Sequence, residues 1–325
     1  MTSRDQQYDV VIIGGGAAGL SGAVALARSR RSVLVVDAGE PRNAPADGVH
    51  NYLGREGTPP GDLLAIGRAE LADYGGEVVS GVVTAARRDD DGAFRVTLED
   101  GHAVGARRLL VATGLVDELP DLPGVAERWG RDVLHCPYCH GWEVRDQPIG
   151  ILATGPTAVH QALLFRQLSD DVTFFRHTGP DLPEEEAEQL AALGIRMVDG
   201  EVGGLEVSED RLTGVRLVSG EVVPRAAVVV APRFTARADV LASLGLEATE
   251  QEMRGHVVGS AVAADPTGAT VVPGVWVAGN VSDMSAQVVV SAAAGMRAGA
   301  MINADLVMED ARLAVAASRE TVGAR

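Results

Sequence analysis

The sequence predicts an α/β protein with two domains, each built around a parallel β-sheet. A strand–helix–strand pattern occurs twice, first at the N-terminus and again from near residue 148. The strands of both patterns are continuous apolar runs, which is typical of parallel strands buried on both faces. The length of 325 residues suits about two domains, and the hydrophobic content of 46% indicates a well-packed globular chain.

The first pattern opens with a strand at 9–13 and a glycine-rich loop, after which a helix and a second strand at 32–39 follow. Further strands are expected at 78–86, 94–98 and 108–112, with "DDDG" at 89–92 as a hairpin turn.

The second pattern consists of a strand at 149–155, a helix at 156–168 and a strand at 171–177. Later strands are expected at 225–232 and 274–280, and a long helix at 285–306. We therefore predict that the second domain is inserted in the first. The predicted boundaries are 1–117 with 246–325 for the first domain, and 118–245 for the second.

Charge and composition exclude several classes of protein. The net charge of −17 argues against nucleic acids and anionic membranes as partners. All 28 basic residues are arginine, so no lysine can serve as a Schiff base or general base. No apolar run is long enough to span a bilayer. The polar segment 1–9 leads directly into the first strand, so we expect no signal peptide and a cytoplasmic protein.

The loop after the first strand places Gly14, Gly16 and Gly19 in the spacing G-x-G-x-x-G. The first glycine allows a tight turn, the second lets the backbone approach a pyrophosphate, and the third lets the helix pack on the strand. Asp37, at the end of the second strand, can bind ribose hydroxyls. The motif predicts a Rossmann-like dinucleotide site, without choosing between FAD and NAD.

The two cysteines of the chain, Cys136 and Cys139, lie in "HCPYCHGWE". A zinc site needs four ligands, and His135, His140 and both cysteines would have to form a tetrahedron within six consecutive residues. A structural disulfide across so short a loop would remove little chain entropy. A redox-active pair is the favoured interpretation, since neighbouring imidazoles can lower a thiol pKa or move protons. A purely structural role for His135 stays open.

Four blocks, in this order, resemble the thioredoxin reductase-like flavoproteins. They are "VVIIGGGAAGLSGA", "LLVATG" at 109–114, the C-x-x-C pair, and "GVWVAGN" with "SAQVVVSAAAG" behind it. The resemblance covers nearly the whole chain. It implies the FAD/NAD(P)-binding disulfide oxidoreductase fold, with two Rossmann-like, three-layer ββα domains, FAD in the first domain, and a homodimer.

The resemblance also implies which residues contact FAD. They are Gly14, Gly16, Ala17 and Ala18 at the pyrophosphate, Gly19 as the third glycine of the same loop, Asp37 and Ala38 at the ribose, Arg42 and Asn51 at the phosphates or ribityl chain, Val83 at the adenine, Ala112, Thr113 and Gly114 along the cofactor, Gly279 and Asn280 at the ribityl group, and Gln287 and Val288 at the flavin edge. Asn280 departs from the aspartate of the family but can still hydrogen-bond a hydroxyl.

The glycine loop expected for NADPH in the second domain departs from the family pattern. It is "ATGPTA", with Ala153 in place of the first glycine, and the added methyl has a steric cost at a tight turn. Glu184, Glu185 and Glu186 follow the next strand, where a 2'-phosphate would need positive charge. These residues argue against NADPH.

The cysteine segment departs as well, because His140 stands where thioredoxin reductases have a proton-donating aspartate. "HCPYCHGWE" resembles a subgroup, the FAD-dependent dithiol oxidases. Those enzymes close the disulfides of natural products such as gliotoxin and holomycin and pass the electrons to oxygen.

We therefore expect an FAD-dependent dithiol oxidase of antibiotic biosynthesis, with a small-molecule dithiol as substrate and O2 as acceptor, giving H2O2. His140, aided by His135, would deprotonate the substrate, and the thiolate would attack Cys136. Cys139 would be the cysteine nearer the flavin. The alternatives are an NADPH-dependent thioredoxin reductase-like enzyme, a reductase fed by another donor such as ferredoxin, and a non-catalytic FAD-binding redox sensor.

Overall fold

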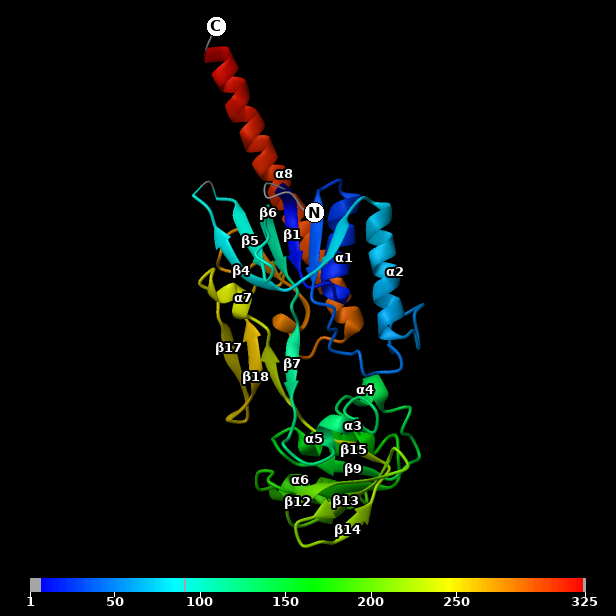
Figure 1. Ribbon diagram of the computed structural model, residues 1–325. Coiled ribbons are helices and arrows are strands. Elements are labelled where there is room, and N and C mark those ends of the chain that lie inside the picture. The colour runs from blue at the N-terminus through cyan, green and yellow to red at the C-terminus, as the bar shows by residue number, and fades with distance from the viewer. Residues whose placement is uncertain (1–6, 91, 324–325) are drawn as a thin grey trace.

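The computed structural model describes residues 7–90 and 92–323, which form an upper and a lower half in Figure 1. The upper half holds a seven-stranded sheet of order β3-β2-β1-β6-β5-β4, with β19 also paired to β6. Its strands are β1 (Gln7–Ile13), β2 (Val33–Asp37), β3 (Glu77–Ser80), β4 (Val83–Arg88), β5 (Phe94–Leu98), β6 (Ala103–Val111) and β19 (Val275–Val277). The apolar run of β1 is buried on both faces, as a parallel strand between β2 and β6 requires.

Three helices belong to this half: α1 (Ala17–Arg28), α2 (Pro60–Asp73) and α8 (Val288–Gly323). The helices α1 and α8 pack closely because glycines face each other at their crossing. A Cβ atom at Gly295 would lie 1.9 Å from the carbonyl oxygen of Ala18, and one at Gly299 would lie 2.7 Å from that of Gly22. The last turns of α8 extend away from the body of the molecule (Figure 1).

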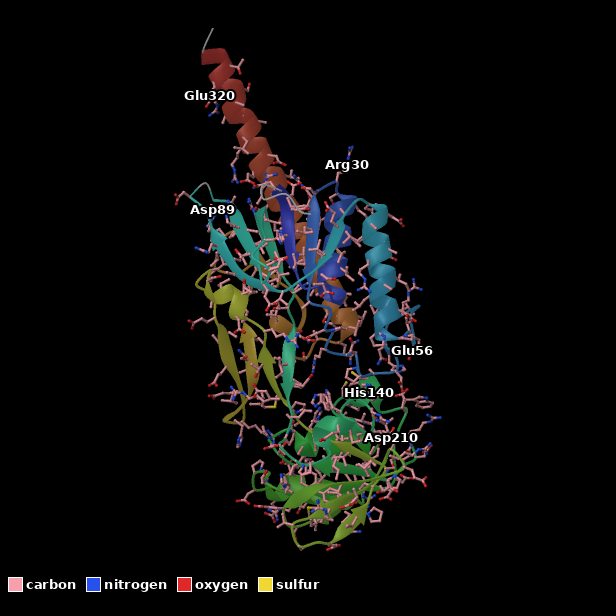
Figure 2. The ribbon with its side chains drawn as sticks, in the orientation of Figure 1. Arg30, Glu56, Asp89, His140, Asp210 and Glu320 are labelled. Atoms are coloured by element: carbon pink, nitrogen blue, oxygen red, sulfur yellow. The ribbon has the colours of Figure 1, made fainter. Side chains whose placement is uncertain are left out.

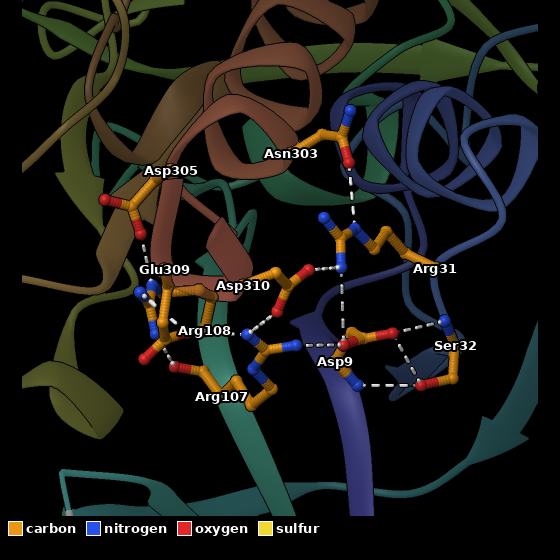
Figure 3. Close-up of polar contacts among 9 residues, drawn as sticks. All are labelled: Asp9, Arg31, Ser32, Arg107, Arg108, Asn303, Asp305, Glu309 and Asp310. Carbon is orange, nitrogen blue, oxygen red and sulfur yellow. Dashed lines mark hydrogen bonds and ion pairs between the residues drawn. The ribbon is translucent and has the colours of Figure 1, made fainter. Parts of the chain in front are cut away.

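A cluster of charged side chains fastens the middle of α8 to the central strands β1 and β6 of the sheet (Figure 3). Arg107 on β6 donates to Asp9, Glu309 and Asp310 at 2.8, 2.8 and 2.5 Å. Arg31, which follows α1, donates to Asp310 at 2.7 Å. The cluster therefore joins α8 to β1, β6 and the end of α1.

The lower half contains a parallel five-stranded sheet of order β11-β10-β9-β15-β8 and an antiparallel three-stranded sheet of order β12-β13-β14. Its strands are β8 (Val133–Leu134), β9 (Ile149–Leu152), β10 (Val172–Phe175), β11 (Arg196–Val198), β12 (Val202–Ser208), β13 (Arg211–Leu217), β14 (Val222–Pro224) and β15 (Ala227–Val229). Its helices are α3 (Val125–Arg128), α4 (Pro137–His140), α5 (Ala158–Phe165) and α6 (Glu184–Ala192).

A four-stranded sheet lies where the chain passes between the halves (Figure 1), and its order is β17-β18-β16-β7. Its strands are β7 (Leu115–Glu118), β16 (Arg233–Ala236), β17 (Ala248–Met253) and β18 (His256–Val262). The short helix α7 (Asp239–Ala242) connects β16 with β17, and the short helix η1 (Gly279–Val281) follows β19. The outgoing strand β7 and the returning strand β16 pair antiparallel. The two passages of the chain are thus hydrogen-bonded to each other.

The structure corrects some predicted elements. The single strand expected at 78–86 is two strands, because β3 pairs with β2 at one edge of the sheet whereas β4 pairs with β5 at the other. Helix α2 was not predicted, and α8 continues well beyond residue 306. The predicted turn at 89–92 includes residue 91, which lies outside the described residues. Within the described part of the chain, no helix is long and apolar enough to cross a membrane.

Candidate active site

A cavity of about 1870 Å³ lies between the upper and lower halves. Its wall combines the glycine loop after β1, the segment after β2, the cysteine loop and the N-terminal end of α8. A site for one drug-sized ligand has a volume of about 300–1,000 Å³. The cavity therefore has room for a large cofactor and a small substrate together.

The glycine loop forms a cradle with one open face. Gly14 has a φ of +104°, and a Cβ atom there would lie 2.4 Å from the carbonyl oxygen of Ala112, so only glycine fits. The backbone N–H of Gly15 donates to Asp37 at 2.9 Å. A Cβ atom at Gly16 would meet nothing within 4 Å, so this position opens into the cavity at the start of α1. These features fit a pyrophosphate at a helix N-terminus.

Most of the residues predicted to contact FAD line this cavity. Besides Gly14, Gly16 and Asp37, they are Ala17, Ala18, Ala38, Arg42, Val83, Ala112, Thr113, Gly114, Gly279, Asn280, Gln287 and Val288. Gln287 directly precedes α8, so the N-terminus of that helix, with its partial positive charge, meets the cavity wall.

Gly19 and Asn51 are not among the residues that line the cavity. A Cβ atom at Gly19 would lie 1.9 Å from the carbonyl oxygen of Gly14, so Gly19 permits helix–strand packing. The side-chain amide of Asn51 donates to the carbonyl of Tyr138 at 2.6 Å. Asn51 therefore ties the segment before α2 to the cysteine loop.

Arg42 makes its contacts with other side chains of the protein. It donates two hydrogen bonds to Asp117, at 2.8 and 2.7 Å, and one to Asn280 at 3.2 Å. Its guanidinium carbon lies 5.2 Å from the centre of the Phe234 ring. Asn280 in turn donates to the carbonyls of Asp283 and Ala286, both at 2.9 Å, which an aspartate could not do. Arg42 and Asn280 thus brace the cavity wall.

The cysteines lie at the start and within the single turn of α4, and both line the cavity. Their sulfur atoms are 2.7 Å apart, so only a small movement separates the dithiol from the disulfide. The hydrogen bond from Cys139 lowers the pKa of Cys136 to about 7. The same hydrogen bond, together with burial, raises the pKa of Cys139. Cys136 is therefore the first thiol of the pair to ionise.

His140 ends α4 and lies where the lower half faces the upper one (Figure 2). Its Nε2 atom is buried and has no hydrogen-bond partner within the described residues. Burial lowers the pKa of His140, which favours the neutral imidazole. A neutral imidazole beside a dithiol can accept a proton. The described residues contain no group of three or more His, Cys, Asp or Glu side chains arranged to hold a metal ion.

His135 lines the cavity at the end of β8. Its ring meets the ring of Phe234 edge-on, with centroids 5.1 Å apart. Burial is the main cause that lowers its pKa. Sequence reasoning missed three neighbours, Phe234, Asp117 and the buried Gln161, because their positions are far from residue 135 and belong to no motif.

The second dinucleotide loop is present but altered. Thr154, Gly155 and Thr157 line the cavity, whereas Ala153, which takes the place of a glycine, is buried. Arg176, a candidate for binding a 2'-phosphate, has Asp181 and Asp199 at 3.6 and 3.5 Å. These carboxylates would compete with a phosphate for the guanidinium.

Comparison with known proteins places the chain in a family. The profile of the pyridine nucleotide-disulphide oxidoreductases matches residues 8–299, and the chain belongs to that family. The thioredoxin reductase sirT of Leptosphaeria maculans is 30% identical over 312 residues, which cover 91% of this chain and 93% of that protein. The thioredoxin reductase tcpT of Claviceps purpurea (strain 20.1) is 37% identical over 191 residues, which cover 56% of this chain and 60% of tcpT.

Solved structures are similar over nearly the whole length. The crystal structure of HlmI superimposes with a TM-score of 0.89 at 48% identity, covering 97% of each chain. An oxidoreductase from Agrobacterium tumefaciens superimposes with a TM-score of 0.86 at 33% identity, covering 93% of this chain and 99% of that one.

These matches confirm the predicted fold and the thioredoxin reductase-like class, and they support the dithiol oxidase subgroup. The protein is an FAD-dependent thiol/disulfide oxidoreductase. The roles of the individual site residues stay predictions.

Proposed function

We propose that the protein is an FAD-dependent oxidase that closes a disulfide in a small-molecule dithiol, with O2 as the electron acceptor. One observation carries this proposal: the Cys136–Cys139 pair, flanked by His135 and His140, faces the same cavity as the FAD-motif residues. The likeness to the sirT and HlmI proteins supports the same class of enzyme.

The chain's own residues carry out the thiol exchange. His140 accepts a proton from one substrate thiol, and the resulting thiolate attacks Cys136 of the protein disulfide. Cys139 leaves, and a disulfide then joins the substrate to Cys136. The second substrate thiol then attacks the substrate sulfur that is bonded to Cys136, and Cys136 leaves. One disulfide is formed and one is broken, and two electrons and two protons pass from the substrate to the cysteine pair.

The low pKa of Cys136, about 7, makes it a good leaving group in this last step. When bound, FAD would supply the two-electron chemistry needed to re-form the protein disulfide and to reduce O2 to H2O2. The residues that would hold it are those of the glycine loop, Asp37 and the start of α8.

A second candidate is an NADPH-dependent disulfide reductase. The position of Thr154, Gly155 and Thr157 in the cavity wall favours it. The buried Ala153 and the carboxylates beside Arg176 oppose it.

The decisive measurement compares NADPH and a dithiol as electron donors to the flavin. Without oxygen, excess NADPH should leave the flavin absorbance unchanged, whereas dithiothreitol should bleach it. With oxygen, dithiothreitol should be consumed together with O2, and H2O2 should form. Rapid bleaching by NADPH would instead establish the reductase.

The cysteine variants provide the control for the dithiol route. Cys136→Ser and Cys139→Ser should each keep bound FAD but lose oxygen consumption, because the exchange needs both sulfur atoms. If both variants kept turnover, the cysteine pair would be removed from the mechanism.

We also propose that the protein is a homodimer and that it is cytoplasmic. Exposed apolar side chains along α8, among them Met296, Met301, Val307 and Met308, support a partner surface on that helix.

A further inference from the structure

Gln161, on α5, is a buried amide that the thiol exchange does not use. Its side chain is 4% exposed, and its Oε1 atom is buried with no partner within the described residues. A buried amide oxygen without a hydrogen-bond partner lowers the stability of the fold. We therefore expect the NH2 end of the same side chain to have a role that offsets this cost.

The contacts of the amide fix its orientation. Its Nε2 atom lies 3.2 Å from the carbonyl of Val230 and 3.3 Å from the carbonyl of His135. Carbonyls only accept hydrogen bonds, so the NH2 end must face them. Both N–H groups of Gln161 therefore donate to these two carbonyls.

The same carbonyl defines the protonation of the His135 ring. The Nδ1 atom of His135 lies 3.1 Å from the carbonyl of Val230 and 3.1 Å from Nε2 of Gln161. Because both amide hydrogens of Gln161 point at carbonyls, neither is left for Nδ1 of His135. Nδ1 must therefore carry a proton and donate it to the carbonyl of Val230. The lone pair of the neutral ring then lies on Nε2.

The remaining surroundings of His135 are compatible with a neutral ring. The charged groups that act on it are Arg42 and Asp117, which form an ion pair with each other, so their effects oppose. Cys136 follows directly in the chain. An uncharged amide at position 161 adds no carboxylate that would favour the imidazolium.

We propose that Gln161 is a positioning residue: by donating to the carbonyls of Val230 and His135, it holds the Val230 carbonyl where it accepts from Nδ1 of His135, which leaves the Nε2 lone pair of the neutral ring available. This proposal rests on the proposed dithiol chemistry, because it states what keeps His135 able to accept a proton. Helix α5 begins just after the altered dinucleotide loop, at the carboxyl edge of the lower sheet. In a dinucleotide-binding domain this edge serves the nucleotide, whereas here it supports the histidine before Cys136.

Three variants test the proposal. Gln161→Glu places a carboxylate beside Nδ1, Gln161→Met keeps the length but removes the N–H groups, and Gln167→Leu alters an exposed glutamine just beyond α5 as the control. Long-range ¹H–¹⁵N spectra of histidine-labelled holoenzyme report the tautomer and pKa of each imidazole. The His135 signal is assigned by its loss in His135→Asn.

We expect the wild type and Gln167→Leu to show His135 protonated at Nδ1. Gln161→Glu should raise the pKa of His135 by about one unit or more. In the same variant, the rate of anaerobic flavin bleaching by dithiothreitol should reach its half-maximum at a correspondingly higher pH. Gln161→Met should slow bleaching by up to about tenfold, because the carbonyls of Val230 and His135 lose a hydrogen-bond donor.

Unchanged His135 signals and an unmoved pH profile in both Gln161 variants would overturn the proposal. So would a loss of rate that only follows a lower melting temperature. If dithiothreitol failed to bleach the wild type, the proposed function would fail, while the spectra would still decide the role of Gln161.

Discussion

The surroundings of the Cys136 thiol change its acidity strongly. Its lowered pKa depends first on the hydrogen bond from Cys139, and the charge of Arg42 adds a smaller contribution. The thiolate is the reactive form, so the reduced protein should react with thiol reagents from about pH 7 upward.

This dependence can be measured by alkylation of the anaerobically reduced protein with iodoacetamide, followed by mass spectrometry. The rate at Cys136 should rise with a midpoint at about pH 7. In Cys139→Ala the midpoint should move to higher pH, because the donor is lost. In Cys139→Ser, which keeps a hydroxyl donor, it should stay nearer the wild type. Equal midpoints in the two variants would show that the hydrogen bond does not control Cys136.

The open face at Gly16 leads to a second prediction. Gly16→Ala should fold normally, because its Cβ atom meets nothing, but the methyl group would intrude on the pyrophosphate. Overpacking of about 1–3 kcal/mol corresponds to a loss of FAD affinity of about fivefold to about 140-fold. Reconstitution of the apoprotein, followed by flavin fluorescence, measures this affinity.

Gly155→Ala is the matched control, since a Cβ atom there also meets nothing within 4 Å but lies on the second loop. It should leave FAD affinity unchanged. Full affinity in Gly16→Ala would place the pyrophosphate elsewhere.

Local spacing predicted the glycine loop and the cysteine pair because each lies within a few consecutive residues. The environment of His135 could not be predicted this way. Gln161, Val230 and Phe234 reach it from three separate segments, and only the parallel register of β8 and β15 brings Val230 beside residue 135.

Among the elements, α8 is fastened by charged contacts. Without Arg107, the carboxylates of Asp9, Glu309 and Asp310 would each lose an ion-pair partner, and Arg31 and Arg108 alone would have to balance their mutual repulsion. Arg107→Met should therefore lower the melting temperature by about 2–4 °C, with the loss shrinking at high salt. Arg312→Met, at an exposed position further along α8, is the control and should have little effect. A salt-independent loss would point to packing instead of charge.

Periodicity predicted the buried strands β1 and β2 well, because their apolar runs are continuous. The prediction of one strand at 78–86 was wrong. The apolar character continues across the passage from β3, at one edge of the sheet, to β4, at the other edge. Gly81 lies in this passage, and a Cβ atom there would lie 3.0 Å from Leu98. A single glycine between two edge strands leaves no break in hydrophobicity for a sequence pattern to detect.

For the whole molecule, the division into 1–117 with 246–325 and 118–245 remains a proposal. The pairing of β7 with β16 supports an outgoing passage near residue 117. It favours a return at Arg233–Ala236, ahead of residue 246. Sequence patterns do not locate this return, because β16 has only four residues and β16, β17 and β18 are only partly buried.

Arg42 joins side chains from widely separated parts of the chain, up to 238 positions apart. Substitutions at Arg42, Asp117 and Asn280 cannot act independently, because Arg42 is a hydrogen-bond partner of both other residues. Contacting residues of this kind typically show coupling of about 0.5–3 kcal/mol. An aspartate at position 280 would still accept from Arg42 but would lose the donation to the carbonyls of Asp283 and Ala286. These positions should vary as a block in evolution, so that a change accepted in one relative is harmful when transplanted alone into another.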